Sequence, residues 1–224
     1  ILQRLEDRFR LLTAGSPGVM PRHQTLRASI DWSNELCSEQ ERLLWARLSV
    51  FSAGFRLPAA EAICSSNELD ERDVLGVLAS LVDKSIVLAE ELDGQPRYRL
   101  LAAIRQYGLE RLRADGAEEA QRRRHRDYFA DLAERARTEW LGPEQEQWLH
   151  ALHHEHGNLR AAFEFCFTEP DEAGTGLRMT SALWFFWIAT GLTGEGCRWL
   201  ERGLGLDKRP SRARARALWV AGYL

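Results

Sequence analysis

The sequence lacks any apolar run long enough to cross a lipid bilayer. Its richest apolar stretch, "ALWFFWIATGL" at residues 182–192, is much shorter than the about 20 residues that a transmembrane helix needs. The first residues, "ILQRLEDRFRLL", are charged and amphipathic and contain no continuous apolar segment of a signal peptide. We therefore expect no membrane partner and a cytoplasmic location.

Motifs that bind phosphate, activate a serine or hold catalytic zinc are also missing. The sequence contains no Gly-x-x-x-x-Gly-Lys-Ser/Thr loop, no Gly-x-Ser-x-Gly turn and no His-Glu-x-x-His pair. The cysteines, Cys37, Cys64, Cys166 and Cys197, are scattered and form no Cys-x-x-Cys pair, which favours a reduced compartment over a disulfide scaffold or a zinc site. We expect no catalytic residue, no metal site and no cofactor in this segment, which is therefore not an enzyme by itself.

An excess of positive charge is absent as well. Lys and Arg number 30 and Asp and Glu number 33, which gives a formal net charge of −3. Proteins dedicated to nucleic acid are usually basic, so this balance argues mildly against that class.

The first half of the chain has the order of elements of a winged helix. Helical spacing predicts helices at residues 22–36, 38–50, 58–63 and 71–83, with Ser38 and Glu41 as a capping box and Asp70 as an N-cap. Next come the β-prone "SIVLAEEL", an Asp93-Gly94 turn and "RYRLL", and then a helix at 103–113. Short helices followed by one hairpin are the winged-helix plan.

The second half predicts only helices. We expect them at about 118–140, from 143 onward with a break at Gly157, at 176–190, at 194–204 and from Pro210. The triplet "ALW" occurs at 182–184 and again at 217–219, an offset close to the tetratricopeptide period of about 34 residues. The fold class is therefore mainly α: a winged-helix domain with one small β-hairpin, followed by an α-α superhelical, tetratricopeptide-like repeat region that binds a protein or a small-molecule effector.

Two clusters invite a functional interpretation, and each has a plainer one. His150 and His154 lie one helical turn apart, as two metal ligands would, but no third ligand accompanies them, so we expect a solvated helix face. The basic run "RRRHR" at 122–126 is flanked by acidic residues, which predicts a solvated face with the ion pairs Glu118–Arg122 and Arg123–Asp127.

The predicted recognition helix also carries the wrong charge for DNA. In a DNA-binding winged helix, the helix before the hairpin enters the major groove and presents donors. Here its outward residues are expected to be Arg72, Asp73, Gly76, Ser80 and Asp83, and the hairpin tip reads "EELDGQP". Both surfaces are net acidic, so we expect this winged helix to pack on protein.

A family resemblance fits that expectation. It is carried by "PRHQTLRASIDWSNELCSEQERLLWARLSVFSAGFRLPAAEAIC", by "RLEDRFRLLT" before it, and by "LVDKSIV", "RYRLLAAIRQYGLERL", "RRRHRDYFADLAE", "EHGNLRAAFEF" and "GEGCRWLERGL" after it. Over nearly its whole length the chain resembles the winged-helix and repeat segment of bacterial NB-ARC (STAND) signal-transduction ATPases, which include LuxR-type and antibiotic-regulatory transcription factors.

The resemblance implies a role as one part of a switch. In such proteins a P-loop ATPase core precedes this segment, the winged helix folds over the nucleotide, and the repeats sense an effector. It implies ATP or ADP and magnesium in a longer protein, its own ATPase core as a partner, and DNA contact only through a module outside this chain. One feature differs: where many members have Met-His-Asp, this sequence has Leu100-Leu101-Ala102.

These observations give three domains and one tentative contact. We expect residues 1–13 to end a preceding helical domain, 14–116 to form the winged helix and 117–224 to form truncated repeats. Arg22 and His23 open a helix, where free N–H groups and the dipole favour a nucleotide phosphate, although both side chains could simply cover the helix start. The competing hypotheses are a winged-helix transcription factor with effector-binding repeats and a stand-alone repeat scaffold.

Overall fold

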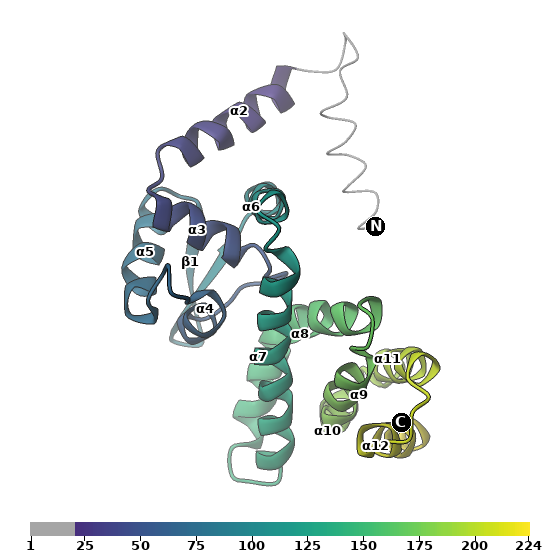
Figure 1. Ribbon diagram of the computed structural model, residues 1–224. Coiled ribbons are helices and arrows are strands. Elements are labelled where there is room, and N and C mark those ends of the chain that lie inside the picture. The colour runs from purple at the N-terminus through teal and green to yellow at the C-terminus, as the bar shows by residue number, and fades with distance from the viewer. Residues whose placement is uncertain (1–20) are drawn as a thin grey trace.

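The computed structural model describes residues 21–224, and their first half forms the predicted winged helix (Figure 1). Its elements are α2 (Pro21–Glu35), α3 (Glu39–Leu48), α4 (Leu57–Cys64), α5 (Glu71–Asp83), β1 (Val87–Leu92), β2 (Gln95–Leu100) and α6 (Ala102–Ala114). The expected helix at the start of the chain and the boundary at residue 13 lie outside the described residues.

Local sequence signals account for these boundaries. Ser38 accepts a hydrogen bond from the Glu41 N–H, and the Glu41 side chain accepts one from the Ser38 N–H, so the capping box begins α3 as predicted. Asp93 and Gly94 have φ angles of 53° and 70°, which the two-residue hairpin turn requires. β1 and β2 pair antiparallel with Val87 opposite Leu100. The mainly α fold class and the single hairpin are confirmed for the described residues.

A third, very short strand completes the winged helix. The N–H and C=O of Phe55 exchange hydrogen bonds with those of Tyr98, both at 2.8 Å. Phe55 lies between α3 and α4. The elements therefore follow the winged-helix order of one helix, a short strand, two helices and a hairpin. No sequence pattern predicted this pairing, because a single residue in extended conformation has no periodicity.

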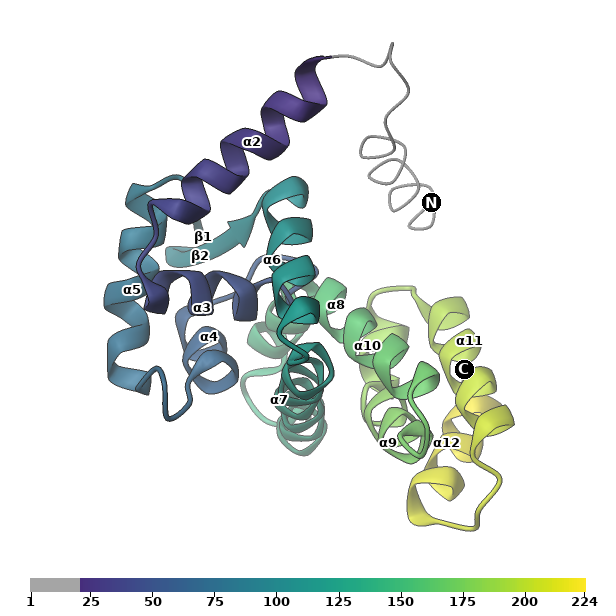
Figure 2. The ribbon, with the colours of Figure 1, turned by 45° about the horizontal axis from the view of Figure 1, so that its top comes forward.

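The second half is entirely helical. It consists of α7 (Glu118–Glu139), α8 (Gln145–Thr168), α9 (Ala173–Ala182), α10 (Trp184–Ala189), α11 (Thr193–Leu206) and α12 (Arg212–Tyr223). α7 and α8 pack against each other, and α12 packs against both α9 and α11 (Figure 2). Within residues 21–224, no helix combines the length and the apolarity that crossing a membrane requires.

Three details of the helical predictions are wrong. α8 runs through Gly157 without a break. The helix expected at 176–190 is divided at Leu183, where the Trp187 indole N–H donates to the Thr180 carbonyl at 3.0 Å. In α2, helical spacing places Leu26, Ile30 and Leu36 near one face and predicts that they are buried together, but only Ile30 is buried, while Leu26 and Leu36 are about half exposed.

One hydrophobic core extends from the winged helix into the helical region. Phe51 and Phe55 stack at 4.5 Å between ring centroids, and Phe51 meets Phe129 of α7 edge-on at 6.5 Å. The same buried cluster continues through Leu159 to Trp187. The core therefore continues past residue 116, and the three predicted domains stay a prediction.

Candidate functional site

Helix α5 occupies the position of a recognition helix. Asp70 caps it by accepting a hydrogen bond from the Arg72 N–H, and Val74, Leu78 and Leu81 are fully buried against the core. Leu75 is half exposed. Arg72, Asp73, Gly76 and Asp83 are exposed as predicted, and Ser80 is half-buried.

Every cation of this surface already has a carboxylate partner. Residues 70–100, which hold α5 and the hairpin, contain four Lys or Arg side chains and seven acidic ones. The four ion pairs are Arg72–Asp70, Lys84–Glu41, Arg97–Glu155 and Arg99–Glu90. Hydrogen bonds from Arg72 lower the pKa of Asp70 to about 2, so this carboxylate stays ionised. The surface that would face DNA therefore offers no unpaired positive charge.

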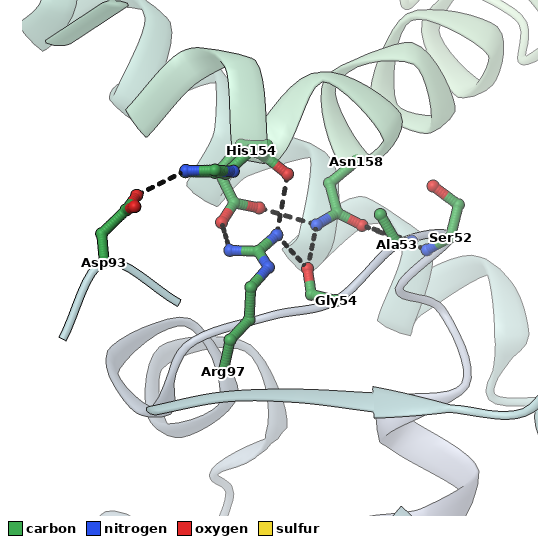
Figure 3. A network of polar contacts seen from close by, with 8 residues as sticks. Ser52, Ala53, Gly54, Asp93, Arg97, His154 and Asn158 are labelled. Carbon is green, nitrogen blue, oxygen red and sulfur yellow. Dashed lines mark hydrogen bonds and ion pairs between the residues drawn. The ribbon is translucent and has the colours of Figure 1, made fainter. Parts of the chain in front are cut away.

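The wing is fixed to the helical region through Arg97, which points from β2 towards α8 (Figure 3). Its guanidinium pairs with Glu155 at 2.6 Å and donates to the carbonyls of His154 and Gly54. The side chains of Arg97 and Glu155 are only 10% and 12% exposed. A buried pair with this many hydrogen bonds is strongly held, because losing one partner leaves a charge without solvent.

Asn158 extends the same network to the loop after α3. Its side-chain oxygen accepts from the N–H groups of Ser52 and Ala53 at 3.1 and 3.2 Å, and its amide donates to Gly54 and Glu155. Asn158 is completely buried. All of its hydrogen-bonding groups are satisfied, so this side chain fixes the loop against α8.

The histidine cluster differs from the prediction of a solvated face. His150 and His153 are exposed, but His154 contacts Asp93 at the wing tip at 2.8 Å (Figure 3) and His156 contacts Glu195 of α11 at 3.2 Å. Among the described residues, no three side chains of the metal-ligating types come together. His154 therefore links α8 to the wing, and His156 links α8 to α11.

The basic run at 122–126 is only partly solvated. The Glu118–Arg122 pair is present at 2.9 Å, but Arg123 pairs with Glu119 and Glu172 instead of Asp127. His125 and Arg126 are buried, and Arg126 also pairs with Glu172. The run therefore belongs largely to the packing between α7 and the segment before α9.

Arg22 and His23 lie in the first turn of α2, as expected from Pro21. Their side chains lie outside the part of the molecule that the structure describes, so the phosphate contact stays a prediction.

The sequence did not single out the residues of the wing network, Arg97, Glu155 and Asn158. The one available signal was Gly157-Asn158 in the middle of a long helix, because both residues are poor helix formers. Both residues contact a distant segment, the loop after α3.

Comparison with known proteins supports the fold assignment. Residues 37–113 match a family model described as "Winged helix-turn-helix domain". This range begins just before α3 and ends within α6.

Full-length relatives extend the similarity to the helical region. The chain is 40% identical over 224 residues to the protein named "Putative HTH-type transcriptional regulator Rv0890c" of Mycobacterium tuberculosis, and equally to a protein of that class in Mycobacterium bovis. A second M. tuberculosis protein, named only as uncharacterized, is 41% identical over 130 residues, which is 58% of this chain and 33% of that protein. The first two alignments include 97% of this chain but only 25% of each relative, so the chain spans about a quarter of their length. No solved structure matches.

Proposed function

We propose that this chain is the regulatory segment of a transcription regulator and that its winged helix binds protein instead of DNA. The observation that carries the proposal is the charge of the surface formed by α5 and the hairpin, where seven acidic side chains accompany four cations that are all paired. Counterion release from phosphate supplies most non-specific DNA affinity, and it needs Lys and Arg side chains that neutralise phosphates, whereas this surface is net acidic. The names of the long relatives support a role in transcription.

The resemblance to NB-ARC (STAND) proteins supports a switch function. In this proposal the winged helix packs on an ATPase core that lies elsewhere in a longer protein, which binds ATP or ADP with magnesium. The fixed wing fits such a component, because Arg97 and Asn158 hold the hairpin and its neighbouring loop in one orientation relative to α8.

The helical region is proposed as the effector-binding part. Ala182 and Ala217, one "ALW" repeat apart, are both fully buried, and Trp184 meets Trp219 edge-on at 6.2 Å. Leu183 is buried, whereas Leu218 is half exposed. Stacked helix pairs of about this period form surfaces that bind protein or small ligands.

A winged-helix transcription factor that contacts DNA directly is the alternative. It is favoured by the matched family description and by the names of the relatives. The charges of residues 70–100 argue against it, and a binding experiment separates the two functions.

That experiment measures fluorescence anisotropy of labelled duplex DNA with the protein, between about 50 and 200 mM salt. We expect no saturable binding at micromolar protein at the higher salt. Micromolar affinity that falls steeply with salt, and that Arg72→Ala weakens, would show that α5 faces DNA and would favour the alternative. Arg209→Ala, in the loop before α12, is the matched control.

The proposed nucleotide contact needs the longer protein. Calorimetry would compare the ADP and ATP affinities of that protein with those of its Arg22→Ala and His23→Ala variants. We expect weaker binding in one or both variants. Unchanged affinities would show that neither side chain contacts the phosphate.

A further inference from the structure

A cavity of about 790 Å³ lies where the winged helix meets the helical region. Its walls come from the loop after α3, both ends of α6, the start of α7, the second half of α8 and one residue of α11. The charged residues of its lining include Arg105, Arg113, Glu118 and Arg122, and its aromatic residues are Phe165 and Trp199. The volume is in the range of small-molecule sites.

The cavity lining holds four arginines and four glutamates, and among the described residues Arg105 is the arginine of this lining that forms no ion pair. Arg113 and Arg122 share one carboxylate, Glu118, at 2.6 and 2.9 Å. Arg105 donates through Nε to the Phe51 carbonyl at 2.7 Å and has no carboxylate partner among the described residues. Burial, and then the charges of Arg122 and Arg113, lower the pKa of Arg105. An unbalanced, half-buried arginine beside two others is favourable for an anion and costly without one.

Most other carboxylates on the cavity wall are paired elsewhere. Glu119 pairs with Arg123, and Glu164 forms two hydrogen bonds with Arg202. Arg160 pairs with Glu195 of α11. Glu169, just beyond the end of α8, is the remaining acid of the wall. Glu118 and Glu119, the carboxylates closest in the chain to these arginines, are therefore already paired, and neither pairs with Arg105.

The two aromatic residues of the lining are held in place. The Trp199 indole N–H donates to Glu195 at 3.1 Å, and its ring stacks on Phe167 at 6.0 Å. Phe165 is buried between α7 and α8. A flat or apolar group could lie against these rings while a charged group reaches the arginines.

We propose that this cavity binds a small molecule with a phosphoryl group at one end and a ring or another apolar part at the other. Terminal N–H groups of Arg105 and Arg122 hold the phosphoryl oxygens, and Trp199 contacts the ring. The biological role of this ligand rests on the effector-binding function proposed above. Its binding can be measured whether or not that function is correct.

The test uses 1-naphthyl phosphate as probe, with inorganic phosphate and 1-naphthol as its two halves, titrated by calorimetry at constant ionic strength. We expect saturable binding of 1-naphthyl phosphate and at least about tenfold weaker binding of either half. Arg105→Gln should weaken the binding of 1-naphthyl phosphate by about tenfold or more. The control is Arg124→Gln, because the Arg124 guanidinium donates to the Ala62 carbonyl outside the cavity, and this variant should leave the affinity unchanged.

A second variant keeps the test decisive if Arg105→Gln does not fold. Ala161→Glu places a carboxylate on the half-buried cavity wall of α8 and should abolish binding by repulsion. No saturable binding to the unmodified protein, or unchanged affinity in the variants that fold, overturns the proposal. Equal affinity for 1-naphthol would show an apolar cavity without an anion site. These failures leave the proposed switch standing, because it rests on the charges of α5 and the wing.

Discussion

Two arginines on one strand show how strongly position decides the value of a charge. Arg97 and Arg99 both lie on β2 and both pair with a glutamate, at 2.6 and 2.5 Å. The Arg97 side chain is almost completely buried and donates hydrogen bonds to carbonyl groups of two other segments. In contrast, the side chains of Arg99 and Glu90 are 43% and 53% exposed.

We therefore expect very different costs from the same substitution. Arg97→Ala should lower the free energy of unfolding by about 3 kcal/mol or more, because Glu155 is left as a buried charge without its partner. Arg99→Ala should cost less than about 1 kcal/mol, since exposed pairs contribute little. Urea denaturation of both variants makes the comparison. Equal costs would show that the network around Arg97 does not hold the wing.

A buried histidine gives the molecule a specific acid sensitivity. Burial, with further contributions from the charges of Arg122 and Arg105, lowers the pKa of His125 to about 3. The unfolded state, with a pKa near about 6.5, binds the proton more tightly, so stability is fully present above that pH and is lost as pH falls towards 3.

The expected loss between pH 7 and pH 5 from His125 is about 2 kcal/mol. His125→Gln should remove it, so the variant should lose less stability than the unmodified protein over this interval. His150→Gln, on the exposed part of α8, is the control and should keep the original slope. Parallel pH profiles for all three proteins would contradict a neutral, buried His125.

At the scale of elements, the ends of the helices follow from local sequence signals. Whether a helix is broken in its middle depends on contacts with segments that are distant in the sequence. α5 spans Glu71–Asp83 as predicted, because its cap and its buried stripe are both local. The break expected at Gly157 does not occur: a Cβ there would lie 2.9 Å from the Cβ of Ala53, so glycine serves close packing with a loop about a hundred residues away. The candidate sites combine that loop, Arg97 and the cavity arginines, which are distant in the sequence and come together only in the folded chain. For this reason the sequence predicted the winged helix but not its candidate sites.

A pair of glycine substitutions tests this explanation. Gly157→Ala should destabilise the protein, because the new methyl group meets Ala53 and separates α8 from the loop. Gly76→Ala lies mid-helix on α5 with nothing within 4 Å, and it should stabilise by up to about 1 kcal/mol. Thermal denaturation of both variants provides the measurement. Stabilisation by Gly157→Ala would mean that the contact is loose.

At the scale of the whole molecule, the continuous core makes the two halves dependent on each other. Phe51 and Phe55 from the winged helix and Phe129 from α7 belong to one buried cluster. Separating the halves would expose these rings, each worth about 1.5–3 kcal/mol of burial. A boundary at residue 116 follows from composition, but composition cannot show packing across it.

We expect calorimetric unfolding in a single transition with equal calorimetric and van't Hoff enthalpies. Two resolved transitions, one of them insensitive to Phe129→Ala, would show that the winged helix unfolds independently. Trp219→Ala, on an exposed side chain of α12, is the control and should leave the number of transitions unchanged.

Helix α8 is a shared support for the wing and for α11. Glu155 pairs with Arg97 of the wing, and Glu164 pairs with Arg202 of α11, and an α-helix places these two glutamates about 14 Å apart along its axis. His156, next to Glu155, also contacts Glu195 of α11. Because α8 is unbroken across these contacts, we expect any change in the orientation of α8 to be felt by the wing and by α11 together.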